Sequence, residues 1–229
     1  MDKIGDYTRL SAAALAIKGI YANPKEFLEN YRTIEENEKK SYLRHYIINN
    51  SPYAFRANPI LFEQIVQYLA DKLGLPTSDV KLIGSAKTGF SISKDNYGRI
   101  YNPVGRDLDF SVINQTLFLD LENEFKSWKQ LYLNDEIVPK NETEKQYWND
   151  NVKGVAVQLQ NGFIDTYKIP NYDKFLNAKK ISNALYLIAR NLERDYSIIP
   201  TKASIRVYSN WETFIKQLKR NTDLILKSQ

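Results

Sequence analysis

The stretches VKLIGSAKTGFS (residues 80–91) and RDLDFSV (residues 106–112) decide the fold expected of this chain. The first opens with a short apolar run, Val80–Ile83, followed at once by glycine, which predicts a strand that ends in a sharp turn at Gly84. The second alternates polar and apolar residues from 107 to 113, which is the period of a half-buried strand. The sequence therefore predicts a strand, a glycine-serine turn and then an acidic strand.

The acidic strand carries two carboxylates, Asp107 and Asp109, separated by Leu108. Residues two apart on a strand point to the same face, so the two carboxylates are expected to project together. Neighbouring carboxylates repel one another, and Mg²⁺ relieves that repulsion by binding one or two of them with water and phosphate oxygens. The spacing indicates a site for Mg²⁺ or Mn²⁺, although a bare Asp-x-Asp is also typical of a solvated strand face.

The glycine-serine turn is suited to holding a phosphate. Gly84 lets the backbone approach a ligand closely, and Ser85 offers a hydroxyl and a backbone N–H. Lys87 and Thr88 add donors in the same loop. The alternative is an ordinary junction between a strand and a turn. Neither the P-loop pattern Gly-x-x-x-x-Gly-Lys-Ser/Thr nor the dinucleotide pattern Gly-x-Gly-x-x-Gly occurs here.

Taken together, residues 80–91 and 106–112 resemble the signature of the DNA polymerase beta-like nucleotidyltransferase superfamily. They look most like a bacterial branch of stand-alone small nucleotidyltransferase-domain proteins, and RVYSNWE at residues 206–212 resembles a C-terminal segment of that branch. The resemblance covers roughly residues 59 to 225 and implies an α+β fold, with a small mixed sheet flanked by long helices.

The resemblance also implies roles for individual residues. Gly84 and Ser85 would bind the triphosphate of a nucleotide, and Asp107 and Asp109 would hold two magnesium ions that orient it. The superfamily has a third carboxylate on a neighbouring strand. Asp165 is the first candidate for that role.

Several further residues have two open readings. Glu212 is the second candidate for the third carboxylate, but it also fits a capping box with Ser209. Arg206 lies between apolar strand residues, so it is expected either to bind phosphate or to pair with a carboxylate. The basic and aromatic residues between the two motifs are expected either to line the nucleotide entrance or to form a solvated hairpin: Lys94, Arg99, Tyr101 and Arg106.

Outside these stretches the chain reads mostly as helix. Residues 1–58 are expected to form a helical N-terminal extension, and residues 59–229 a nucleotidyltransferase-like domain, the two together making either two units or one compact unit. A proline after Asn58 and a glycine at Gly74 bracket one predicted helix. Short strands are predicted at residues 90–93, 155–159 and 203–208, and long helices at 118–132 and 172–195.

Composition narrows the chemistry. The 229-residue chain has no cysteine and one histidine, His45, which excludes thiolate chemistry and a His-Cys zinc cluster and favours a metal held by carboxylate oxygens. The net charge of +5 fits either an anionic partner, such as a nucleotide or RNA, or an AT-rich genome whose proteins use Lys and Asn freely. No apolar run reaches the length of a membrane span, and the N-terminus lacks the apolar core of a signal peptide, so we expect a cytoplasmic protein without membrane contact.

Three functions follow from these patterns. The first is magnesium-dependent transfer of a nucleotidyl group from a nucleoside triphosphate such as ATP to RNA, a protein hydroxyl, a small molecule or another nucleotide. The resemblance places it in a bacterial toxin–antitoxin or antiphage defence setting, with an operon-encoded protein partner. The second is a catalytically degenerate module on the same fold that senses a nucleotide or binds a protein. The third is an RNA-binding protein driven by net charge, which lacks a recognisable RNA-binding motif.

Overall fold

The computed structural model describes residues 4–228, and within them four strands form one sheet. Its order is β1-β2-β4-β3, with β1 and β3 antiparallel to their neighbours and the central β2 and β4 parallel to each other. The strands are β1 (Val80–Ile83), β2 (Val104–Ile113), β3 (Phe163–Asp165) and β4 (Ile199–Tyr208). The predicted α+β class with a small mixed sheet is confirmed.

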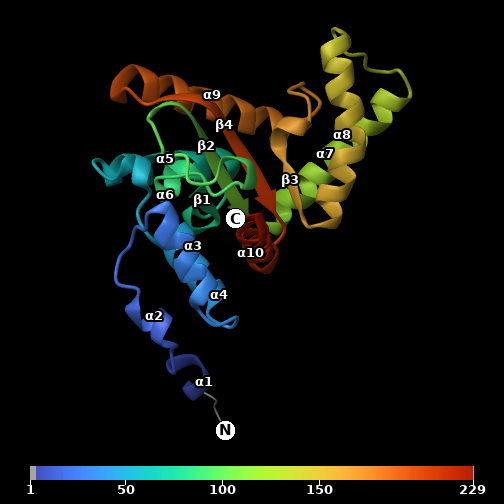
Figure 1. The fold of residues 1–229 in the computed structure, drawn as a ribbon. Coiled ribbons are helices and arrows are strands. Elements are labelled where there is room, and N and C mark those ends of the chain that lie inside the picture. The colour runs from blue at the N-terminus through green and yellow to red at the C-terminus, as the bar shows by residue number, and fades with distance from the viewer. Residues whose placement is uncertain (1–3, 229) are drawn as a thin grey trace.

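Long helices cover one face of the sheet (Figure 1). They are α5 (Pro59–Leu73), α7 (Gln115–Leu133), α8 (Glu142–Gln160) and α9 (Leu176–Tyr196). Alternate residues of the two central strands supply the sheet's part of this core, among them Leu108, Phe110 and Val207, each at most 1% exposed. The period of two along β2 therefore sends Asp107 and Asp109 toward the opposite face.

Two N-terminal helices and the last helix lie on that opposite face (Figure 1): α3 (Pro24–Thr33), α4 (Lys39–Leu43), continued as a π-helix over Arg44–Asn49, and α10 (Trp211–Ser228). The short helices α1 (Ile4–Thr8) and α2 (Ala12–Ala16) lie farther from the sheet. Phe27 and Tyr42 share a core with Phe214 of α10 and Ile113 of β2. The Tyr31 hydroxyl donates a 2.7 Å hydrogen bond to Asp223. The helices α3 and α4 thus pack against the sheet and α10.

Three local predictions were wrong. Residues 155–159 lie in α8, because Trp148, Val152 and Val155 recur at helical spacing on the side that meets the core, and a short apolar run does not by itself distinguish helix from strand. Residues 90–93 make only an isolated bridge between Phe90 and Ile100. The last helix is capped by Asn210, whose side chain accepts from the Thr213 backbone N–H, rather than by Ser209.

No helix among residues 4–228 is long and apolar enough to cross a membrane.

Candidate functional site

A cleft of about 590 Å³ opens on the face of the sheet that carries the acidic residues. The strands β2, β3 and β4 form its floor, the turn after β1 forms one wall, and α10 with the loop at residues 91–99 forms the rest. Of the predicted site residues, six line this cleft: Gly84, Ser85, Asp107, Asp109, Asp165 and Arg206. The tertiary structure therefore brings together segments more than a hundred residues apart.

The glycine turn lies directly against one of the two aspartates. Gly84 has φ +70° and ψ −162°, a conformation that essentially only glycine adopts. A Cβ added to Gly84 would stand 3.0 Å from Oδ2 of Asp109. The antiparallel register explains the proximity, because Ile83, the last residue of β1, pairs with Asp109. The backbone can turn here only because position 84 has no side chain.

Asp109 is the better shielded of the two carboxylates, and Asp107 is exposed on the same cleft. Burial raises the pKa of Asp109, and the nearby charge of Asp107 raises it further. A 2.8 Å hydrogen bond from the Ser204 hydroxyl to Oδ1, together with the positive charges of Lys202 and Arg206, acts in the opposite direction. These contacts leave the Asp109 charge incompletely compensated, which is the environment in which a bound cation is most favourable.

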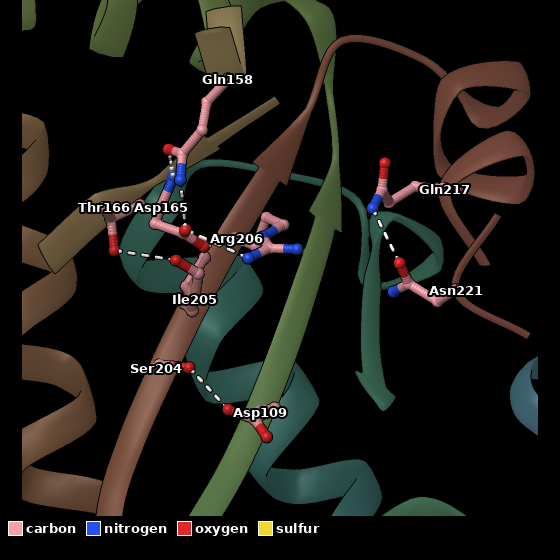
Figure 2. A network of polar contacts seen from close by, with 9 residues as sticks. All are labelled: Asp109, Gln158, Asp165, Thr166, Ser204, Ile205, Arg206, Gln217 and Asn221. Carbon is pink, nitrogen blue, oxygen red and sulfur yellow. Dashed lines mark hydrogen bonds and ion pairs between the residues drawn. The ribbon is translucent and has the colours of Figure 1, made fainter. Parts of the chain in front are cut away.

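Asp165 also lines the cleft, but its carboxylate is paired with the side chains of Arg206 and Gln158 (Figure 2). Its carboxylate accepts from Nε of Arg206 at 2.6 Å and from a terminal guanidinium nitrogen of Arg206 at 3.1 Å. The Gln158 side-chain amide donates to the same carboxylate at 2.6 Å, and the amide oxygen of Gln158 accepts from the Asp165 backbone N–H. Arg206 thus pairs with a carboxylate, which was one of its two expected roles. Because β4 lies between β3 and β2, Asp165 is separated from Asp107 and Asp109 by one strand.

The strand next to β2 presents a hydroxyl where a third carboxylate was expected. In the parallel register Asp109 pairs with Ser204, and Ser111 pairs with Arg206. Glu212, the other candidate, is exposed in the first turn of α10 and does not line the cleft. Within residues 4–228 no three side chains of His, Cys, Asp or Glu gather in a way that could hold a metal. The donor set fits one divalent cation held by Asp107 and Asp109 with water and phosphate oxygens.

Lys87 and Thr88 do not face the cleft, contrary to the prediction. Lys87 is 3% exposed, and its Nζ donates to the backbone carbonyls of Ile48 and Asn50; burial lowers its pKa to about 8. The Thr88 hydroxyl donates to the Phe90 carbonyl at 2.6 Å. In α6 (Ser85–Thr88) each residue advances about 100° around the helix axis, so Lys87, two residues after Ser85, points to about the opposite side from the cleft.

Further cleft residues come from the loop and from α10. Arg99 and Arg106 line the cleft, as one of the two open readings predicted, whereas Lys94 and Tyr101 do not. Ser204 and Asn221 were not identified from the sequence. A serine in a strand and an asparagine in a helix carry no local signal, since their place in the site depends on the register of β4 and the packing of α10.

Comparison of the chain with known protein families, with curated proteins and with solved structures finds no match. The geometry of the cleft therefore provides the basis for assigning a function.

Proposed function

We propose that this chain binds a nucleoside triphosphate together with a divalent cation in the cleft and transfers its nucleotidyl group to an acceptor. The observation that supports this most directly is the contact between the Gly84 turn and Asp109, at 3.0 Å from a Cβ position to Oδ2. A backbone turn without a side chain beside two carboxylates is suited to a polyphosphate bridged to a cation.

Each residue of the cleft has a role in this proposal. Asp107 and Asp109 would hold Mg²⁺ or Mn²⁺, which when bound neutralises phosphate charge and favours departure of pyrophosphate. Ser85 offers its hydroxyl to the triphosphate at the turn. Arg99 and Arg106 supply positive charge at the cleft wall, where phosphate oxygens need it. An acceptor hydroxyl bonds to the α-phosphorus, pyrophosphate leaves, and the hydroxyl proton passes to water.

A second candidate is a module on this fold that binds a nucleotide without turning it over. The position of Asp165 favours it, because among the described residues 4–228 it is the only other carboxylate that lines the cleft, and its pair with Arg206 and hydrogen bond from Gln158 occupy it. A defence setting and an operon-encoded partner remain predictions for either candidate.

One experiment separates the two candidates. Purified protein is incubated with a nucleoside triphosphate labelled at the α-phosphate, with and without Mg²⁺, and both nucleotide binding and covalent incorporation are measured. The test variant is Asp107→Asn/Asp109→Asn, and the matched control is Asp120→Asn, an exposed carboxylate on α7 outside the cleft.

Incorporation that is lost in the double variant and kept in the control supports transfer. Magnesium-dependent binding without incorporation selects the binding module. A wild-type protein that binds no nucleotide in the presence of Mg²⁺ or Mn²⁺ refutes both candidates.

A further inference from the structure

A second cleft, of about 810 Å³, lies beyond the end of β3, between α8, α9 and the first half of β4. We call it the side groove and define it by six of its lining residues, three exposed tyrosines and three lysines: Tyr147, Tyr167, Tyr186, Lys140, Lys168 and Lys202. It is continuous with the first cleft, because Thr201 and Ser204 line both. Ser204 is also the residue whose hydroxyl bonds to Asp109.

Three of the four tyrosines that line the side groove are open to solvent, and the fourth, Tyr172, packs against the core. Tyr147, Tyr167 and Tyr186 are 65%, 56% and 64% exposed, although each belongs to an element that packs on the core. Large exposed aromatic rings that line a single cleft are typical of a surface that binds a flat partner. Tyr167 follows Asp165 of the first cleft by two residues and lines the side groove, so the two clefts adjoin along this short segment.

The charge of the side groove is positive and uncompensated. Glu144 is its one acidic lining residue, and its carboxylate accepts from the Lys140 backbone N–H at the start of α8. None of the three lysines forms an ion pair with a carboxylate in the part of the chain that the structure describes. Instead, Nζ of Lys202 stands 3.6 Å from the centroid of the Tyr167 ring, and Nζ of Lys168 stands 5.9 Å from it. Two ammonium groups therefore lie against the Tyr167 ring.

We infer that the side groove binds single-stranded nucleic acid and presents its terminal hydroxyl at Ser204 as the acceptor. Bases stack on exposed aromatic rings regardless of sequence, and lysines beside the rings neutralise the phosphates between the bases. The acceptor role depends on the proposed transferase function: the terminal oxygen bonds to the α-phosphorus, the bond to pyrophosphate breaks, and the proton passes to water. Nucleic-acid binding by the groove does not depend on that function.

The test measures the binding of a fluorescein-labelled oligouridylate and of an oligothymidylate by fluorescence anisotropy, without nucleotide, over a range of salt concentrations. Wild type is expected to bind, with an affinity that falls as salt rises. In Lys168→Gln/Lys202→Gln the affinity should depend less on salt. The negative slope of log affinity against log salt should become shallower by about 1.4, since each phosphate contact on a single strand contributes about 0.7. Lys153→Gln, an exposed lysine of α8 outside the groove, is the matched control.

Tyr186→Ala tests the stacking surface separately. Its affinity should fall by about fivefold to a hundredfold, as expected for loss of one stacked base. Tyr196→Ala, 47% exposed on the same helix but outside the groove, should bind as wild type does. Because these side chains are largely exposed, the melting temperatures of the variants should stay close to that of wild type.

The outcomes distinguish the groove from the transferase. Absence of oligonucleotide binding at low salt, or equal losses in groove and control variants, overturns the inference and leaves nucleotide binding in the first cleft untouched. Normal oligonucleotide binding without label transfer retains the groove as a nucleic-acid site and overturns its acceptor role. Label transfer to a protein, by an enzyme with no affinity for either oligonucleotide, overturns the inference. Transfer to the oligonucleotide that is weakened by the groove variants supports it.

Discussion

Replacing Gly84 with alanine tests the central contact of the cleft. The φ of +70° and ψ of −162° at Gly84 fall in a region that costs an L-residue about 1–3 kcal/mol. The new Cβ would also stand 3.0 Å from Oδ2 of Asp109, which is closer than ordinary van der Waals contact, so the carboxylate must shift. A chain of this size loses about 2–4 °C of melting temperature per kcal/mol, so Gly84→Ala should melt about 2–12 °C below wild type.

Nucleotide binding distinguishes a loss of stability caused by backbone strain alone from a disruption of the cleft. Isothermal titration of a nucleoside triphosphate with Mg²⁺ should show at least a tenfold loss of affinity for Gly84→Ala, about 1.4 kcal/mol, because the displaced carboxylate no longer meets the cation and phosphate together. The matched control is Gly74→Ala. Gly74 caps α5 with φ +68°, and an added Cβ there would meet nothing within 4 Å.

The control variant should lose stability of a similar order, about 1–2 kcal/mol for a left-handed residue, and keep its nucleotide affinity. The reasoning is refuted if Gly84→Ala binds nucleotide as tightly as Gly74→Ala does. In that case the turn would be close to Asp109 without being close to the ligand.

Two further predictions concern the charges of the cleft. Burial raises the pKa of Asp109 above its ordinary value of 3.8. As pH rises past 3.8, the unfolded chain therefore releases a proton that the folded chain still holds. The free energy of unfolding falls over this range and levels off once the pH passes the raised pKa of the folded state. Asp109→Asn lacks this loss and should be more stable than wild type at neutral pH in urea unfolding without metal; lower stability at neutral pH would contradict the assignment. Arg206→Met leaves the carboxylate of Asp165 buried without its cation and should lower the free energy of unfolding by about 3 kcal/mol. This value is the lower end of the range for a broken buried pair, because the Arg206 side chain is 31% exposed. In a double-mutant cycle with Asp165→Asn the two losses should overlap, and strict additivity would show that the pair is not coupled.

The local patterns of the sequence predicted much of the sheet and the common face of Asp107 and Asp109. Alternation along 107–113 identified β2, and the glycine after Val80–Ile83 identified the end of β1. The proline and glycine signals bracketed α5 correctly. These features depend on neighbours in the chain: side-chain period, caps and positive φ are set within a few residues.

Other local patterns were ambiguous. Residues 155–159 read as a strand because a short apolar run fits both periods, and only the packing of Trp148 and Val155 on the core selected the helix. Lys87 follows Ser85 by two residues and was assigned to the same site. Two residues of helix amount to about half a turn, which directs Lys87 to the opposite side, where it donates to the carbonyls of Ile48 and Asn50.

The sequence alone determined that a glycine-serine turn and two carboxylates on one strand face exist, since both follow from the order of neighbouring residues. Only the tertiary structure decided what surrounds them. Ser204 meets Asp109 across 95 residues and Arg206 meets Asp165 across 41, because the strand order β1-β2-β4-β3 places β4 between β2 and β3. Strand order and register are set by the burial of whole faces, and that burial committed Asp165 to an arginine and joined the side groove to the cleft.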